Sequence, residues 1–344
     1  MDIRLFRQKD SKLWDKYATE SSISNCYHLI GWKNVVERSF GHKTYYLLAE
    51  DSKNKIKGIL PLVHLKSILF GNFIISLPYF NYGGICADNE EISNQLVKEA
   101  EVIAAEKNAE HIELRDTQNN SDGLFVKTTK VSMRLLLPKS SEELWKSFSS
   151  KLRSQIKRPE KVGMYVKSGR EEELESFYDV FSTNMRDLGT PVYSKEFFKN
   201  ILEEFPETTR INTVYAKMGN PVASGFLVGF KEILEIPWAS SLRSYNQYSP
   251  NMLLYWNAFK FACENGYRVF DFGRSTIGEG TYRFKEQWGA KPTQLYWHYW
   301  MRNGGPLPEL NPKNPKYQLA IKIWQKLPVG LTKIIGPMIV KNLP

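Results

Sequence analysis

Cysteine is scarce in this chain of 344 residues. Only Cys26, Cys86 and Cys263 are present, far apart and odd in number, and no two of them share a CxxC spacing. A disulfide framework or a zinc site is therefore not expected, and a reducing compartment fits best. The five histidines also lack the spacing of metal ligands, so no bound metal is predicted.

A long uninterrupted apolar run is also missing. The most apolar stretch, residues 59–80, is broken by His64, Lys66, Asn72 and Pro78. It is too interrupted for a membrane span of roughly 20 apolar residues, and a pair of buried strands is the better interpretation. The opening residues MDIRLFRQKD are charged and contain no apolar signal-peptide core. We therefore expect a cytoplasmic protein.

Several catalytic motifs are absent. The sequence contains no Walker loop, no GxGxxG before a helix, no HExxH and no GxSxG. These absences argue against a P-loop nucleotidase, a dinucleotide-dependent enzyme, a zinc protease and a serine hydrolase of the elbow type.

The composition that is present indicates a globular protein. The chain is 42% hydrophobic and 13% aromatic, and its length suggests about two domains. Its formal net charge of +10 favours anionic partners such as phosphate-bearing substrates, RNA or an acidic membrane surface. Excess lysine that only maintains solubility is the alternative.

One order of elements occurs twice, about 157 residues apart: strands, a long helix, and a short strand carrying an acid. The first copy comprises strands at 44–50, 57–64 and 72–78, a helix at 90–107 and a strand at 111–115. The second comprises strands at 210–217, 220–229 and 232–238, a helix at 250–263 and a strand at 268–272. This repetition predicts an α/β (α+β) fold of two similar lobes, each a twisted mixed sheet flanked by helices. The predicted division is 1–138, 139–302 and a tail at 303–344.

The tail has an unusual charge balance. From Leu310 onward it contains six lysines and no Asp or Glu, and residues 317–326 have an amphipathic pattern that Pro328 ends. A basic amphipathic segment can lie on an anionic membrane, which would place residues 316–344 at the inner face. The alternative is that the tail packs on its own domain.

A cluster of basic residues precedes the predicted strands of the second lobe. Its members are Lys151, Arg153, Lys157, Arg158 and Lys161, of which residues 153, 157 and 161 share one helix face. Such a ridge can bind a diphosphate or an RNA backbone. A solvated helix face is the alternative.

The segment Gly280-Thr-Tyr-Arg-Phe-Lys-Glu-Gln-Trp-Gly289 surrounds one lysine with aromatic residues. Lys285 could stabilise a developing oxyanion in this partly apolar setting. Alternatively, Phe284 and Trp288 are core residues and Lys285 extends to water. Asp271 or Glu235 could accept a proton, although an acid on a strand could equally pair with an arginine such as Arg274.

Residues 238–251 join the end of a strand to the start of a helix, a common place to hold a charged group. A coenzyme A cradle at this point would need glycine, and RSYNQYSPN has none. The corresponding GGICADNEE of the first lobe has Gly83 and Gly84 but no basic residue. Neither lobe therefore has an obvious cradle for coenzyme A.

Six segments in order resemble one known family. They are KLRSQIKRP (151–159), NMRDLGTPVY (184–193), LEIPWASSLR (234–243), PNMLLYW (250–256), FDFGRS (270–275) and GTYRFKEQWGA (280–290). Together they resemble FemAB-like proteins of the exosortase/PEP-CTERM-associated subgroup. The resemblance implies tandem GNAT-like lobes with one active cleft. It also implies transfer of an amino acid from aminoacyl-tRNA to the amine of a lipid- or nucleotide-linked precursor. The helical arm of some Fem proteins is absent, and this subgroup is expected near exopolysaccharide synthesis.

The resemblance implies that Lys285 stabilises the transition state, with Tyr282 and Trp288 beside it. The candidate catalytic residues are Lys285, Asp271 and Tyr282. The candidate substrate-binding residues are Arg153, Lys157, Arg158, Arg186, Trp238, Ser240, Arg243, Asn251, Arg274 and Trp288. No bound cofactor is expected, and the co-substrate is aminoacyl-tRNA, acyl-CoA or an acyl carrier.

Three further interpretations stay open. The first is an N-acyltransferase that uses acyl-CoA or a carrier. The second is a non-catalytic, membrane-docked component of an exopolysaccharide machine. The third is RNA binding without transfer. A monomer is expected in each case.

Overall fold

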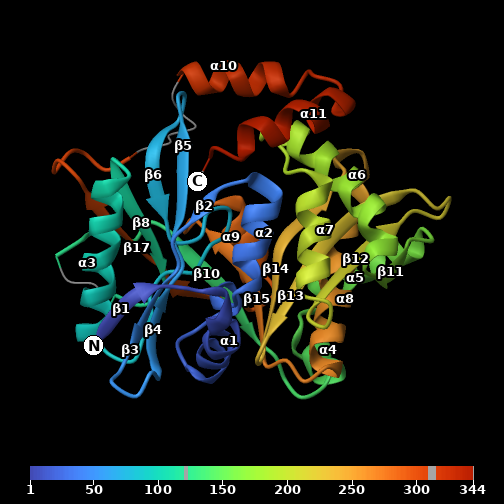
Figure 1. Cartoon of the computed structure of the whole chain (residues 1–344). Helices are drawn as coiled ribbons and strands as arrows, with labels where there is room; N and C mark the ends of the chain where they lie inside the picture. Colours follow the sequence, from blue (N-terminus) through green and yellow to red (C-terminus); the bar gives the residue numbers. More distant parts are fainter. Residues whose placement is uncertain (120–122, 309–314, 344) are drawn as a thin grey trace. The chain divides into compact units, whose positions relative to one another are not determined.

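The structure is a computed structural model that describes residues 1–119, 123–308 and 315–343. The chain forms two compact units (Figure 1). Unit 1 takes Met1–Val131, Gln294–Glu309 and Asn342–Pro344, and unit 2 takes Ser132–Thr293 and Leu310–Lys341. The units thus interleave along the chain, whereas the predicted division at 138 and 302 is sequential.

The described residues of unit 1 form two sheets and three α-helices. The four-stranded sheet has the order β1 (Asp2–Leu5), β3 (Leu47–Glu50), β4 (Ile56–Leu60), β7 (Cys86–Ala87). The six-stranded sheet has the order β2 (Lys43–Thr44), β5 (Val63–Ser67), β6 (Gly71–Ile75), β8 (His111–Asp116), β17 (Tyr296–Met301), β9 (Phe125–Lys127). The helices are α1 (Ser11–Glu20), α2 (Gly31–Phe40) and α3 (Glu90–Glu106).

Helix α3 begins where the sequence predicts. The Asn89 side chain accepts a hydrogen bond from the Ile92 amide at 3.0 Å, which satisfies one of the unpaired amides of the first turn. Ile92, Leu96 and Ala100 recur at helical spacing and are buried in the core of unit 1. The predicted helix at 90–107 is confirmed.

Strand β17 explains why unit 1 includes a late part of the chain. All six of its residues pair antiparallel with β8, from Tyr296 opposite Asp116 to Met301 opposite His111. Residues that local patterns assign to the second lobe are therefore part of the sheet of unit 1.

Unit 2 is built on one seven-stranded sheet. Its order is β11 (Tyr165–Gly169), β12 (Thr209–Tyr215), β13 (Pro221–Phe230), β14 (Ile233–Ser241), β15 (Val269–Ser275), β10 (Val131–Leu136), β16 (Lys291–Gln294). Its helices are α4 (Ser141–Ser147), α5 (Ser150–Lys161), α6 (Glu171–Leu188), α7 (Lys195–Glu204), α8 (Pro250–Glu264), α9 (Gly280–Glu286), α10 (Pro315–Trp324) and α11 (Val329–Val340).

Helices cover both faces of this sheet. The ring of Phe226 on β13 packs against Phe177 of α6 and Phe198 of α7, at centroid distances of 5.7 and 5.9 Å. A Cβ at the preceding Gly225 would instead lie 3.5 Å from Leu254 of α8. Successive strand residues point to opposite faces, so α6 and α7 lie on one side of the sheet and α8 on the other.

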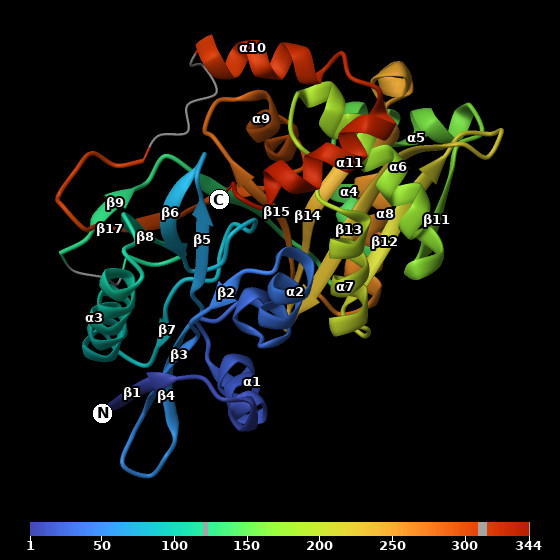
Figure 2. The ribbon, with the colours of Figure 1, turned by 45° about the horizontal axis from the view of Figure 1, so that its top comes forward.

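The tail packs on its own unit. Helix α11 lies alongside α6 in both ribbon views (Figures 1 and 2). Gly336 is tight against Val192, because a Cβ there would lie 2.8 Å from the Val192 nitrogen. Lys333 forms an ion pair with Asp179 at 2.6 Å. No helix in the described part of the chain is long and apolar enough to span a membrane.

Candidate active site

Strands β14 and β15 separate near their middle. They pair in parallel over three residues, and the last described pair is Glu235 opposite Asp271. Beyond that pair β14 continues to Ser241 and β15 to Ser275, but the described ladder between them has ended. The separation leaves backbone groups of a buried sheet without their usual strand partners, so other groups must satisfy them.

A bend in β15 lies just beyond the last pair. Gly273 has a φ of 71°, which side-chain-bearing residues adopt only at a cost. Its amide donates to Asp271 Oδ1 at 2.8 Å, so the strand's own acid holds the bend. The glycine of the FDFGRS segment therefore allows the positive φ that the bend requires.

Lys285 of α9 reaches this bend. Its Nζ donates to the carbonyl oxygens of Gly273 and Arg274 at 3.0 and 2.9 Å. The side chain is buried at 8% exposure, so the alternative in which it extends to water is wrong. An ammonium group has three N–H donors, and the third has no acceptor among the described residues.

The surroundings of Lys285 change its titration. Burial is the main cause and lowers its pKa from 10.5 to about 8, because charge is poorly solvated there. The carboxylates of Asp271 and Glu235 oppose the shift. With a pKa of about 8 the ammonium form is still the major one near neutral pH.

Asp271 is an anchor in this geometry. It is 1% exposed and accepts hydrogen bonds from Ser132 Oγ at 2.7 Å and Arg134 Nε at 2.9 Å, in addition to the Gly273 amide. Its ion pair is with Arg134 of β10, where the sequence had suggested Arg274 as an example. These three hydrogen bonds give Asp271 a structural role in holding β10 and the bend of β15.

Sequence reasoning missed Ser132 and Arg134. They are two residues apart on β10, so they lie on the same face of the strand. Two polar residues at that spacing in the run Val131–Leu136 were the available signal. Their partner could not be identified, since it lies 137 or more residues away.

Two polar atoms near this segment lack partners. Ser275 Oγ, at the end of β15, and Trp288 Nε1, one turn beyond Lys285, are buried and have no hydrogen-bond partner among the described residues. The Trp288 ring is 1% exposed and packs against Phe259 and Phe148, with centroid distances of 5.0 and 5.5 Å. Buried polar atoms without partners are uncommon and mark places where a ligand or water can bind.

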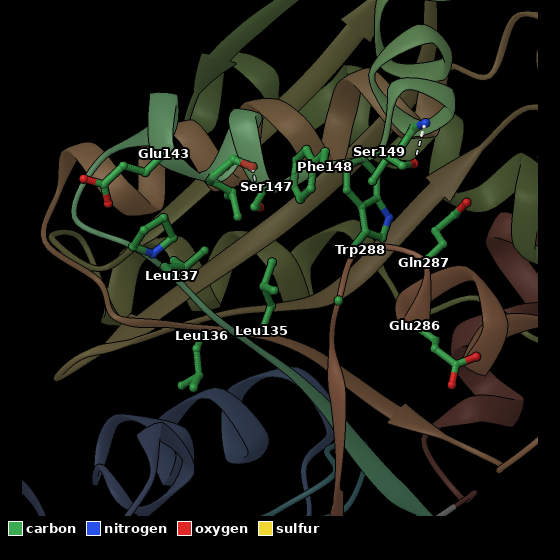
Figure 3. A pocket seen from close by; sticks show the side chains of 14 residues that line it. Leu135, Leu136, Leu137, Glu143, Ser147, Phe148, Ser149, Glu286, Gln287 and Trp288 are labelled. Carbon is green, nitrogen blue, oxygen red and sulfur yellow. Dashed lines mark hydrogen bonds between the residues drawn. The ribbon is translucent and has the colours of Figure 1, made fainter.

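Trp288 also lines a pocket of unit 2. The cavity measures about 620 Å³ and lies between the end of β10, helices α4 and α5, and the chain after α9 (Figure 3). Leu135, Leu144 and Phe148 form part of an apolar wall, and Glu143 and Gln287 are among its polar residues. Its size is typical of a small-molecule site. The sequence did not predict this pocket.

The basic ridge forms the helix that its spacing predicts. Arg153, Lys157 and Arg158 lie on α5, where Arg153 is half-buried and the other two are exposed. The Lys157 ammonium is 5.5 Å from the centre of the Trp145 ring. Binding of a diphosphate by these residues stays a prediction.

Other candidates have structural partners. Arg186 pairs with Asp187 at 2.7 Å and donates to the carbonyl of Leu327 in the tail at 3.0 Å. Arg243, although exposed, donates to the Asp187 carbonyl at 2.8 Å. The two arginines therefore fasten the end of α6 and the tail, a contact across 141 residues that no local pattern predicts.

Trp238 and Ser240 are buried on β14. The Trp238 ring packs at 5.1 Å from Phe198 and 5.5 Å from Phe197. Ser240 accepts a hydrogen bond from Asn184 Nδ2 at 3.0 Å. Trp238 thus contributes to the core behind the sheet.

The last three candidates lie closer to the strand separation. Asn251 is half-buried on the first turn of α8, Arg274 is exposed on β15, and Tyr282 is half-buried one turn before Lys285 on α9. The 3₁₀ helix Arg243–Tyr248 occupies the chain just before α8, and Ser249 follows with a left-handed φ of 56°. A coenzyme A cradle made of glycine amides is therefore not found at this place in the described chain.

The family model for the acetyltransferase (GNAT) domain matches residues 146–286, all within unit 2. This region, which contains both strands of the separation and Lys285, is a GNAT-type domain. No curated protein matches the chain.

Solved structures show where the whole fold belongs. FemX superposes with a TM-score of 0.67 at 15% identity, covering 93% of this chain and 100% of FemX. L-PGS from Bacillus licheniformis gives 0.55 at 13%, covering 94% and 99%. A tandem GNAT protein from the clavulanic acid biosynthesis pathway gives 0.54 at 8%, covering 89% and 99%. The predicted tandem GNAT-like α/β fold is confirmed.

Proposed function

We propose that this chain is an acyltransferase of FemAB type, which moves an aminoacyl group to the amine of a cell-envelope or exopolysaccharide precursor. One observation carries the proposal: the buried Lys285 ammonium has one N–H with no acceptor among the described residues, at the point where β14 and β15 separate. The likeness to FemX and to L-PGS supports an aminoacyl donor.

The reaction needs no covalent enzyme intermediate. The acceptor nitrogen attacks the donor's ester carbonyl carbon, and the new C–N bond gives a tetrahedral intermediate. The C–O bond to the leaving group breaks when this intermediate collapses to the amide. The amine's proton ends on the departing oxygen, which leaves as a hydroxyl group. The third N–H of Lys285 donates to the oxyanion of the tetrahedral intermediate, where burial strengthens the interaction.

The other residues position this lysine. Asp271 holds the bend at Gly273, and the bend presents the two carbonyl oxygens that orient Nζ. Because the Lys285 ammonium is held in place before the substrate binds, this hydrogen-bond donor does not need to reorganise during the reaction. The basic face of α5, with Arg153, Lys157 and Arg158, is our candidate for a diphosphate of the acceptor. Either a lipid-linked or a nucleotide-linked precursor would carry that group.

An acyl-CoA or carrier-bound acyl donor is the second candidate. The GNAT-domain match over residues 146–286 favours it, whereas the chain before α8 argues against a glycine cradle for coenzyme A. A thioester would react in the same way, with a thiol as the leaving group.

A donor assay separates the two. Purified protein receives labelled aminoacyl-tRNA in one reaction and labelled acyl-CoA in another, with lipid-linked glycans and peptides as acceptors. We expect labelled product from aminoacyl-tRNA and at least 100-fold less from the Lys285→Met variant. Product from acyl-CoA alone would show that the acyl donor is acyl-CoA and not aminoacyl-tRNA. Absence of transfer from aminoacyl-tRNA, acyl-CoA and a charged carrier protein would refute an acyltransferase.

A further inference from the structure

The two tail helices have exposed apolar faces. On α11, Thr332, Gly336 and Val340 recur every four residues and are buried. Leu331, Ile334 and Met338 lie on the opposite side of the helix and are 40%, 69% and 65% exposed. The helix is therefore apolar on its docked face and on its solvent face alike.

Helix α10 continues this pattern. Leu319 and Ile323, one turn apart, are 62% and 55% exposed, while Trp324 is buried. We call the five exposed side chains Leu319, Ile323, Leu331, Ile334 and Met338 the tail surface. A surface helix normally turns polar residues to water, so five large apolar side chains on two consecutive helices indicate a missing apolar partner.

The charges beside the tail surface identify the partner. Residues 310–344 contain six lysines and no Asp or Glu. Lys322, Lys326 and Lys341 are exposed, and Lys333 forms an ion pair with Asp179 of α6. The tail therefore combines exposed apolar side chains with lysines and contributes no acid of its own, which suits a surface that offers hydrocarbon beneath a layer of negative charge.

We propose that the tail surface binds an anionic lipid bilayer and lies flat in its headgroup region. The apolar side chains enter the boundary between headgroups and acyl chains, and the lysines contact lipid phosphates. The helices are held on unit 2 by Gly336, Lys333 and the Arg186–Leu327 contact, so the surface is present before binding. The tail thus packs on its own unit with one face and binds lipid with the other.

Vesicle sedimentation tests this with the full chain. Vesicles of 30% phosphatidylglycerol in phosphatidylcholine are compared with pure phosphatidylcholine. We expect binding to the anionic vesicles, at least tenfold weaker binding to the neutral ones, and a further loss in 0.5 M salt. The variant L319S/I323S/I334S/M338S should lose at least tenfold in binding to anionic vesicles. Lys322→Glu with Lys326→Glu should weaken only the anionic binding.

A matched control is Met218→Ser, since Met218 is 86% exposed in a turn of unit 2 outside the tail surface. It should bind vesicles as the parent does, and thermal melting of every variant checks the fold. Equal binding by the parent and the quadruple variant would overturn the proposal, as would no vesicle binding at all. Light scattering that detects a dimer of the parent and a monomer of the quadruple variant would also overturn the proposal, because a second copy of the chain would then be the partner.

Discussion

Units 1 and 2 each contain a parallel strand pair that ends inside the unit, and a different buried cation lies beyond the end of each pair. In each, a parallel strand pair stops at an acid: Ile75 opposite Glu113 in unit 1, and Glu235 opposite Asp271 in unit 2. In each, one buried cation then donates to backbone carbonyls beyond the last pair. Arg115 does so in unit 1 and Lys285 in unit 2.

Unit 1 fills the space with its own chain. Arg115 donates to the carbonyl of Phe80 at 2.5 Å and to Glu113 at 2.7 Å, and its guanidinium lies 4.6 Å from the centre of the Trp297 ring. Tyr299 donates to the second oxygen of Glu113 at 2.8 Å. The Nε and Nη1 groups of Arg115 therefore donate to a carboxylate and to backbone carbonyl oxygens of the same unit.

The neighbouring acid of unit 1 is also engaged. Asp116 accepts from the Ile85 amide at 2.7 Å and lies 2.8 Å from His298 Nδ1, and its burial raises its pKa. A Cβ at Gly84 would lie 2.0 Å from Asp116 Oδ1, so only glycine allows this approach. In unit 2, Lys285 donates to two backbone carbonyl oxygens, and no carboxylate among the described residues forms an ion pair with it as Glu113 does with Arg115. We propose that unit 1 uses the arrangement for stability and that unit 2 is the better candidate for catalysis.

The largest expected effect is on the stability of unit 1. Arg115→Met leaves Glu113 as a buried charge without its cation, and we expect a loss of about 3–5 kcal/mol in unfolding free energy. Urea denaturation measures it. The double variant Glu113→Gln/Arg115→Met removes both charges and should recover most of the loss. A single variant within 1 kcal/mol of the parent would show that the ion pair is not needed.

The next effect is on catalysis in unit 2. Lys285→Met should lower kcat by about 10²–10³-fold, as removal of an oxyanion donor does. Its thermal midpoint should change by only about 2–4 °C, which corresponds to roughly 1 kcal/mol in a domain of this size. Single-turnover rates and calorimetry measure the two. A large fall in stability with an unchanged rate would show that Lys285, like Arg115, has a structural role and no catalytic one.

The pH dependence sharpens the same distinction. The pKa of Lys285 is about 8, and the acting form is the cation, so the rate should fall about tenfold per pH unit above 8. A Lys285→Arg variant that keeps activity should lose this fall, because arginine stays charged. A rate that rises through pH 8 would instead indicate a neutral lysine acting as a base.

Stability should respond in the opposite direction. The folded pKa of Lys285 is below its ordinary value of 10.5, so the unfolded chain keeps this proton to higher pH. The contribution of Lys285 to folding therefore becomes more favourable as pH rises from about 8 towards 10.5. Denaturation of the parent and of Lys285→Met across this range isolates the effect.

The smallest effect concerns the bend itself. Gly273→Ala places a side chain at φ 71° and should cost about 1 kcal/mol in unfolding free energy. Gly280→Ala is the matched control, since a Cβ there meets nothing within 4 Å and φ is not positive. The control should be neutral or slightly stabilising. Equal costs at the two positions would contradict a special backbone role for Gly273.

Much of the fold could be predicted from local patterns. The helix at 90–107, the helix at 250–263 and the repeated order of elements follow from periodicity and caps, and α3 and α8 agree closely with them. The pairing of β17 with β8 could not be predicted. Register between strands about 180 residues apart depends on which surfaces meet, and a single sequence does not encode that locally.

In the candidate site, too, local features could be predicted from the sequence and long-range contacts could not. Aromatic neighbours indicate a partly apolar setting for Lys285 and leave open whether its ammonium extends to water; in the structure the side chain is buried. The partners of Asp271 and Arg186 depend on contacts across more than 130 residues, so sequence reasoning could not assign them. Trp238 was chosen as a binding residue, but it packs among Phe197, Phe198 and Phe226.

The most direct test measures single-turnover transfer by Lys285→Met and by Arg115→Met, each corrected for the fraction folded. We predict that Lys285→Met loses at least 100-fold while folded Arg115→Met stays within about threefold of the parent. The reverse result, with Arg115→Met inactive though folded and Lys285→Met unaffected, would contradict the assignment of catalysis to unit 2.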